Sequence, residues 1–178
     1  MNNSKEITVL DIFEKTVEQY PDKVAIKDLN GALTYSQLRS NAQKIGAAIC
    51  YNLGGKRNCP IAVFIDKGCE CLVTMLGILY SGNCYVPMDI KTPLDRMQSI
   101  LTTLESDIVI ATEESKGNLE KIGYSQPIWL YEELLEQYQE KDAPEEILSD
   151  IRWQIVDTDL MYILFTSGST GIPKGVAI

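Results

Sequence analysis

Apolar residues recur at helical spacing in two stretches near the start of the chain. The first stretch predicts a helix that begins with a capping box of Thr8 and Asp11 and ends at Pro21. Its apolar face consists of Leu10, Phe13, Val17 and Tyr20. The second stretch predicts a helix that begins with a similar pair, Thr34 and Gln37, and ends at the glycines 54–55. Its apolar stripe consists of Leu38, Ala42, Ile45 and Ile49.

Short apolar runs between the helical stretches predict β-strands. They occupy residues 23–27, 60–65, 84–87, 107–111, 127–131 and 160–165. Further helices are expected over 68–81 and from Pro93, which stands at the first helical position with Asp95 in the third. We interpret the acidic stretch 132–150 as a solvated helix followed by a loop that contains Pro144.

Strands and helices therefore alternate along the chain, which predicts an α/β fold with a mainly parallel sheet flanked by helices. The run 60–65 is apolar at every position, as expected for a strand that helices cover on both faces. A length of 178 residues favours a single domain, and no internal repeat, low-complexity segment or linker divides the chain.

The charge of the chain is unevenly distributed. There are 16 Lys and Arg residues against 25 Asp and Glu residues, a net charge of −9, and residues 101–150 hold 13 acids and 3 bases. No basic stripe is left to neutralise a nucleic-acid backbone or an anionic membrane surface. The N-terminus lacks the basic start and apolar run of a signal peptide, and no apolar run is long enough to span a bilayer. We expect a soluble, cytoplasmic protein that binds neither nucleic acid nor membrane.

The chain contains no histidine, which excludes the Ser-His-Asp and Cys-His nucleophile arrangements and most zinc and haem sites. Its five cysteines are odd in number and include no Cys-x-x-Cys pair, which indicates reduced thiols. Only one residue separates Cys69 from Cys71, a spacing that does not suit a zinc knuckle. We interpret the five cysteines as core or surface thiols.

One segment differs from the rest in composition. Residues 166–175, TSGSTGIPKG, follow an apolar strand and combine four hydroxyl residues, three glycines and one lysine. Glycines allow backbone N–H groups to turn inward around an anion, and hydroxyls add further donors. Lys174 supplies a charge for the outer phosphates, and Pro173 fixes the backbone before it. The segment suits a polyphosphate, although its composition alone fits a flexible Gly/Ser loop between two strands equally well.

A Walker A loop, G-x-x-x-x-G-K-[ST], is a second interpretation of this segment, and we reject it. Counted from Gly168, the second glycine is replaced by Pro173, and Gly175 stands where Ser or Thr would bind magnesium. Residues 176–178 also read as a strand, where a Walker loop would open a helix.

The order of the residues carries a family resemblance. Residues 164–176, LFTSGSTGIPKGV, closely resemble the phosphate-binding signature of adenylate-forming enzymes: acyl-CoA synthetases, luciferases and the adenylation domains of non-ribosomal peptide synthetases. Residues 33–38, LTYSQL, resemble the first core motif of peptide-synthetase adenylation domains, and residues 79–89, LYSGNCYVPMD, resemble the second. Residues 13–26 look like the usual start of such domains, so the resemblance covers essentially the whole chain. We expect the first two motifs to serve folding and residues 166–175 to serve function.

The resemblance implies a fold, a reaction and a set of ligands. The fold is the N-terminal portion of the large subdomain of an adenylate-forming enzyme. The reaction is that of a ligase, which joins a carboxylic acid to ATP with Mg²⁺, releases pyrophosphate and passes the acyl group to the thiol of a carrier protein or of CoA. The second motif favours an amino acid as the substrate, and an acyl-CoA synthetase is the alternative. The resemblance places the ATP phosphates on Thr166, Ser167, Gly168, Ser169, Thr170, Gly171 and Lys174, and Mg²⁺ on Thr166.

Several segments that complete such an enzyme lie further along the family's sequences. They are the acid pocket, a magnesium-binding glutamate, a ribose-binding aspartate and a C-terminal catalytic lysine, which is not Lys174. We therefore expect residues 1–178 to form a single incomplete α/β domain, an N-terminal fragment that carries no catalytic residue and is inactive alone. The alternative is a non-catalytic remnant or partner module that complements a separate C-terminal chain.

Overall fold

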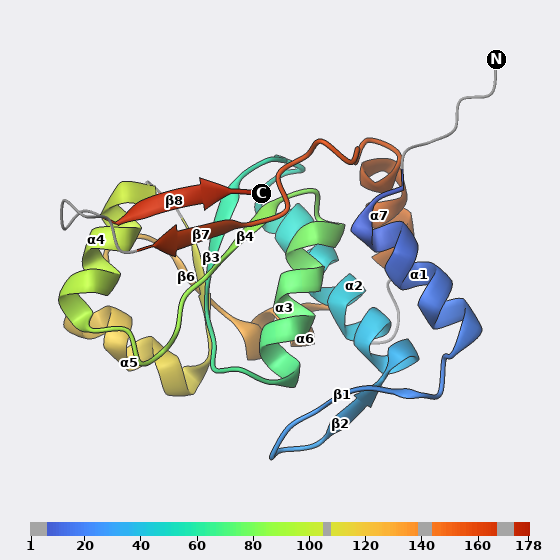
Figure 1. The fold of residues 1–178 in the computed structure, drawn as a ribbon, viewed down its shortest axis with the longest axis horizontal. Helices are drawn as coiled ribbons and strands as arrows, with labels where there is room; N and C mark the ends of the chain where they lie inside the picture. Colours follow the sequence, from blue (N-terminus) through green and yellow to red (C-terminus); the bar gives the residue numbers. More distant parts are fainter. Residues whose placement is uncertain (1–6, 105–107, 139–143, 167–172) are drawn as a thin grey trace.

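The computed structural model describes residues 7–104, 108–138, 144–166 and 173–178. At its centre lies a parallel sheet with the strand order β4-β3-β5-β6 (Figure 1). Its strands are β3 (Pro60–Phe64), β4 (Cys84–Pro87), β5 (Val109–Ala111) and β6 (Ile128–Leu130). The sheet confirms the predicted α/β class, and each of its strands lies within a predicted run.

Helices cover both faces of this sheet. The first face carries α1 (Val9–Gln19), α2 (Tyr35–Asn52), α3 (Cys69–Tyr80), α6 (Tyr131–Gln137) and α7 (Pro144–Arg152), and the second carries α4 (Leu94–Leu104) and α5 (Glu113–Lys121). Because successive side chains of a strand point to opposite faces, β3 serves two cores. Ile61 and Val63 contribute to the first core, whereas Ala62 and Phe64 contribute to the second. None of the described helices is both long and apolar enough to cross a bilayer.

The interpretation of the acidic stretch 132–150 is wrong. The stretch contributes to two helices, α6 and α7, and Pro144 begins α7 instead of lying in a loop. Leu134, Leu148 and Ile151 are buried in the first core, so these helices are amphipathic and not simply solvated. Helix α4 begins at Leu94, so Pro93 directly precedes the helix instead of occupying its first position as expected.

Reciprocal side-chain caps fix the starts of three helices. The predicted capping boxes of Thr8 with Asp11 and of Thr34 with Gln37 are present at α1 and α2. A third box joins Thr112 to Ser115 at α5. The Ser115 hydroxyl also donates to the backbone oxygen of Phe64 at 2.6 Å, which ties α5 to the carboxyl end of β3.

The antiparallel hairpin of β1 (Val24–Lys27) and β2 (Ala32–Thr34) is held to α3 by the carboxylate of Asp28. This carboxylate accepts hydrogen bonds from the backbone N–H groups of Asn30 at 2.8 Å and Gly31 at 2.9 Å within the turn. It also accepts one from Cys69 N at 2.8 Å, in the first turn of α3. A Cβ on Gly68 would lie 2.7 Å from Asp28 Oδ2, so a larger residue there would displace the carboxylate from this position. The hydrogen bonding with Cys69, followed by the hydrogen bonds from Asn30 and Gly31, lowers the pKa of Asp28 to about 2.

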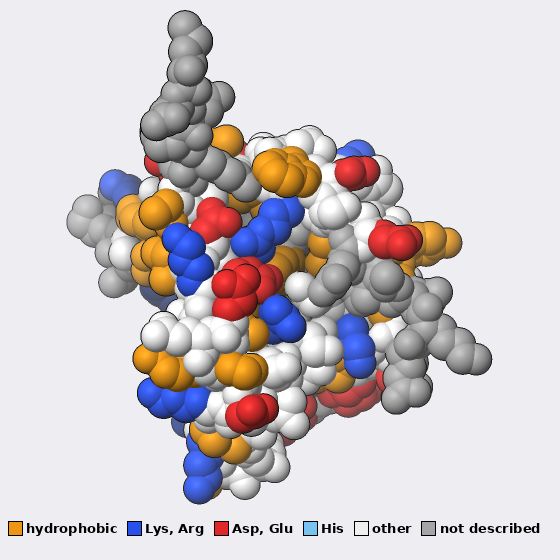
Figure 2. Space-filling view, turned by 90° about the vertical axis from the view of Figure 1, so that its right-hand side faces the viewer, with side chains coloured by type: hydrophobic (Ala, Val, Ile, Leu, Met, Phe, Trp, Pro, Cys, Tyr) orange, Lys and Arg blue, Asp and Glu red, His pale blue; other side chains and the backbone are white. Residues whose placement is uncertain are grey.

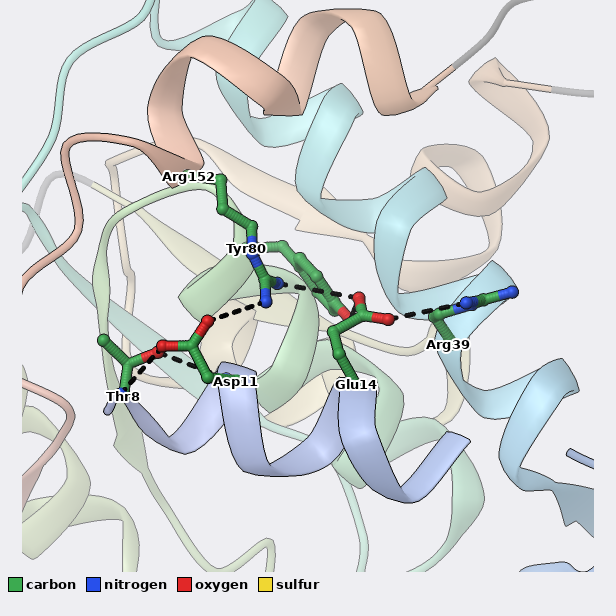
Figure 3. A network of polar contacts seen from close by, with 6 residues as sticks. All are labelled: Thr8, Asp11, Glu14, Arg39, Tyr80 and Arg152. Carbon is green, nitrogen blue, oxygen red and sulfur yellow. Dashed lines mark hydrogen bonds and ion pairs between the residues drawn. The ribbon is translucent and has the colours of Figure 1, made fainter. Parts of the chain in front are cut away.

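A polar network joins α1 to α2, α3 and α7 (Figure 3). The hydroxyl of Tyr80, a buried residue of α3, donates to the carboxylate of Glu14, and burial followed by this hydrogen bond raises the pKa of Tyr80. Arg39 pairs with Glu14 at 3.4 Å, and Arg152 pairs with Glu14 at 3.6 Å and with Asp11 at 3.0 Å. On the face that carries α1, acidic and basic side chains are accordingly interspersed (Figure 2).

We expect the charge of Asp28 to stabilise the fold in a pH-dependent way. Because the folded-state pKa of about 2 lies below the model-compound value of 3.8, the stabilisation is present above pH 4 and is lost as the pH falls toward 2. Asp28→Asn should lower the urea midpoint of unfolding at pH 7, and the difference from the parent chain should shrink between pH 4 and pH 2. A constant difference over this range would contradict a role for the charge.

Glu14→Ala is expected to lower the free energy of unfolding by about 1–3 kcal/mol, because it leaves the buried Tyr80 hydroxyl without its acceptor. Glu18→Ala, one turn further along α1 on an exposed residue, is the matched control and should change stability by less than about 0.5 kcal/mol. Urea unfolding at pH 7 measures both. Equal effects of the two variants would mean that the network does not stabilise the fold.

Candidate functional site

The predicted phosphate-binding segment begins and ends in an antiparallel hairpin. Strand β7 (Ile163–Thr166) pairs with β8 (Lys174–Ala177), and the register places Thr166 opposite Lys174. The Thr166 hydroxyl donates a long hydrogen bond of 3.5 Å to the backbone oxygen of Lys174. The two ends of the segment, Thr166 and Lys174, are therefore held side by side.

Two of the predicted phosphate ligands, Thr166 and Lys174, are described, and both are exposed. The other predicted ligands, Ser167, Gly168, Ser169, Thr170 and Gly171, lie outside the described residues. Pro173 is buried immediately before Lys174, which anchors the start of β8. At the end that adjoins residues 167–173, the hairpin thus presents the hydroxyl of Thr166 and the ammonium group of Lys174.

Strand β4 holds the hairpin against the main sheet, and Figure 1 shows β7 beside β4. Tyr85 and Tyr162 form a parallel bridge, and Tyr85 N donates to the backbone oxygen of Met161 at 3.2 Å. Their rings stack with centroids 5.5 Å apart and an interplanar angle of 25°. Tyr85 lies in the second motif and Tyr162 directly precedes β7. This contact therefore links the second motif to the phosphate-binding segment, a link that sequence reasoning missed.

The hairpin also packs closely on itself. Phe165 contacts the second core and pairs across the hairpin with Gly175. A Cβ on Gly175 would lie 3.0 Å from Ile163 Cγ2 and 3.3 Å from Phe165 Cζ. The last glycine of the segment therefore allows a close approach of β7 side chains to the backbone of β8.

The continuation of the segment as strand β8 agrees with the rejection of a Walker A loop. In that motif the lysine stands at the start of a helix, whose N-terminus contributes to phosphate binding. Lys174 instead begins an antiparallel strand. Lys174 therefore has no helix directly after it whose N-terminus could contribute to phosphate binding.

The carboxyl ends of the parallel strands offer a second place where a nucleotide could bind. In doubly wound sheets ligands bind where the strand order reverses, which here lies between β3 and β5. The N-terminus of α3 at this point is occupied by the Asp28 carboxylate, and Glu70 and Glu114 lie in the same hollow. A phosphate would meet like charges there, so this hollow does not suit a phosphate.

The cysteines offer no alternative chemistry. All five are free thiols, and burial raises the pKa of Cys50 and of Cys71 to about 11, which keeps these thiols protonated and unreactive. Among the described residues, no group of three or more Cys, Asp or Glu side chains is placed to hold a metal ion.

Comparison with known proteins identifies the family. Residues 13–178 match the family described as AMP-binding enzyme. The chain belongs to the AMP-binding enzyme family. Similar curated proteins include nonribosomal peptide synthetase kk1B of Curvularia clavata, 31% identical over 98% of this chain and 1% of that protein. Tyrocidine synthase 1 of Brevibacillus parabrevis is 31% identical over 96% of this chain and 15% of that protein. The chain therefore spans a small part of these AMP-binding relatives.

Solved structures agree with the observed fold. The N-terminal subdomain of Klebsiella oxytoca NpsA, in complex with 3-hydroxybenzoyl-AMSN, superposes with a TM-score of 0.77 at 23% identity. The superposition covers 96% of this chain and 40% of the NpsA chain. VinN superposes with a TM-score of 0.75 at 21% identity, over 97% of this chain and 46% of VinN. This AMP-binding chain thus has the fold of a part of the NpsA N-terminal subdomain.

Proposed function

We propose that this chain is the N-terminal, phosphate-binding part of an adenylation domain that activates an amino acid with ATP for peptide synthesis. The observation that carries the proposal is the hairpin, which brings Thr166 and Lys174 together at the two ends of a segment whose sequence is rich in glycines and hydroxyls. The family match and the peptide-synthetase relatives support it. The carboxylate of the substrate attacks the α-phosphorus of ATP, the acyl-adenylate forms, and pyrophosphate leaves.

In this reaction Lys174 would stabilise the departing pyrophosphate. A lysine ammonium is a compact charge with three donors, and charge on the β- and γ-phosphates increases as the bond to the α-phosphorus breaks. Lys174 is exposed at the start of β8, and no ion pair with a described carboxylate neutralises it. The loop of residues 167–171 would supply backbone N–H groups and hydroxyls to the same phosphates.

Thr166 fits the role of a Mg²⁺ contact. Its hydroxyl is exposed beside Lys174, and its oxygen accepts no hydrogen bond from a described residue, which leaves its lone pairs for a hard cation. When bound, Mg²⁺ would neutralise part of the charge on the phosphates.

The substrate class and partner follow from the branch of the family. The second motif and the peptide-synthetase relatives favour an amino acid as substrate and a carrier-protein thiol as acceptor over an acyl-CoA synthetase activity. We place the protein in the cytoplasm, where its five thiols would stay reduced and ATP is available.

The activity of the whole protein, as its gene encodes it, tests the proposal. The protein should catalyse amino-acid-dependent exchange of pyrophosphate into ATP. Lys174→Ala should lower kcat/KM for ATP roughly 10- to 150-fold, which corresponds to the loss of a hydrogen bond to a charged group, about 1.5–3 kcal/mol. Lys121→Ala, an exposed lysine of α5, is the matched control and should leave exchange unchanged. Unchanged ATP kinetics in Lys174→Ala would show that the segment is not the phosphate site.

We expect residues 1–178 alone to catalyse no exchange, because the family's acid pocket and its ribose- and magnesium-binding carboxylates lie in segments beyond these residues. The reading frame downstream of codon 178 decides where those segments come from. If the frame continues, a protein that contains them should be active. If it stops, adding a separately produced C-terminal part should restore exchange. Exchange by the 178-residue chain alone would contradict this division of the site.

A further inference from the structure

Arg57, in the loop between α2 and β3, reaches the connection that leads from α7 to β7 (Figure 1). Its Nη1 atom donates to Gln154 Oε1 at 3.1 Å, and its Nη2 atom donates to the backbone oxygen of Gln154 at 3.0 Å. Nη2 also donates to Asp159 Oδ2 at 3.1 Å. Because Gln154 follows the end of α7 and Asp159 precedes the start of β7, one guanidinium holds both ends of this connection.

The side chain of Arg57 crosses the second motif at Gly82. A Cβ on Gly82 would lie 2.8 Å from Arg57 Nε and 3.2 Å from Arg57 Cγ, so a larger residue there would displace the arginine. Gly82 also has a φ of +71°, a left-handed conformation that favours glycine. The Nε atom is buried without a hydrogen-bond partner among the described residues, so the two Nη atoms carry the link to the connection.

Asp159, the charged partner of Arg57, is itself fixed within a short turn. Its Oδ2 atom also accepts a hydrogen bond from Val156 N at 3.0 Å, and its own backbone N–H donates to the Val156 oxygen at 3.1 Å. The side chains of Arg57 and Asp159 are only 20% and 25% exposed. A charge-assisted hydrogen bond with limited access to water is stronger than one between fully exposed groups.

The base of the β7–β8 hairpin follows directly after Asp159. Met161 N donates to the backbone oxygen of Ile178 at 2.8 Å, and Ile178 N donates to that of Tyr162 at 3.0 Å. The Met161 oxygen accepts a hydrogen bond from β4, so these residues fix both strands of the hairpin and its contact with the sheet. Thr166 lies four residues beyond Tyr162, roughly 13 Å along a strand, so a small change of direction at the base displaces the far end.

We propose that Arg57 is a positioning residue for the phosphate site, because it fixes the connection from which the hairpin leaves the sheet. This inference rests on the proposed function, since it assigns to Arg57 the placement of Thr166 and Lys174 toward ATP. Arg57 acts through the backbone of residues 159–162 and not by contact with ATP. An arginine suits this role because its planar fork reaches two partners at once, whereas a lysine ammonium is a single point charge.

Kinetics of pyrophosphate exchange by the whole protein test the proposal. Arg57→Met keeps an apolar side chain over Gly82 and removes the guanidinium. It should raise KM for ATP about tenfold and leave KM for the amino acid unchanged. Arg39→Met, which removes the partly exposed ion pair of Arg39 with Glu14, is the matched control and should leave both KM values unchanged. A general loss of folded protein would lower the apparent kcat without raising KM for ATP alone.

Hydrogen exchange tests the positioning independently of ATP. In Arg57→Met the amides of Met161 and Ile178, which pair at the base of the hairpin, should exchange faster than in the parent protein. The amides of β3 should keep their rates. Equally faster exchange in β3 would indicate a general loss of stability and would contradict the proposal.

Two kinetic results would also overturn the proposal. The first is an unchanged KM for ATP in Arg57→Met. The second is full additivity with Lys174→Ala, because a residue that acts by placing Lys174 should matter less once Lys174 is removed. Failure of the proposed function gives a different result, since Lys174→Ala alone then leaves ATP kinetics unchanged, while the hairpin amides still report whether Arg57 holds the hairpin.

Discussion

The burial of strand β3 on both faces is the constraint on which the rest of the structure depends. Ile61 and Val63 need helices on one side, and Ala62 and Phe64 need helices on the other. A parallel strand cannot return to its neighbour by a tight turn, so each connection passes through a helix that supplies this cover. The chain places β4 on one side of β3 and then β5 on the other, and the crevice between their connections follows from that order.

The sequence was sufficient to predict the elements whose pattern is strong. The apolar runs of the parallel sheet and the capping boxes of α1 and α2 needed no tertiary information, because local spacing determines them. The stretch 132–150 was misjudged because its acids outnumber its apolar residues, and Leu134 and Leu148 could be recognised as core positions only from the surfaces that they meet. Helix α5 gave no signal for a similar reason, since Leu119 is its one buried apolar residue among those described.

The residues of the candidate phosphate site stay a prediction, and the contacts that hold its two ends in place could not be predicted from the sequence. Order and residue type in 166–175 were enough to propose phosphate chemistry and to reject a Walker loop, and the strand that begins at Lys174 agrees with this. The stack of Tyr85 on Tyr162 joins residues far apart in the sequence, and no local pattern indicates such a contact. The acidic hollow escaped prediction for the same reason, because its walls come from four separate connections.

The place of the hairpin in the chain has a consequence for how the protein is made. Strand β6, the last strand of the parallel sheet, ends at Leu130, well before β7 begins at Ile163. The four strands of the parallel sheet are therefore synthesised before either strand of the hairpin. The strands β7 and β8 pair with each other locally, whereas their contact with β4 joins the hairpin to a part of the chain that is made much earlier. The part of the sheet that supports the proposed phosphate site is thus made before the residues proposed to bind phosphate.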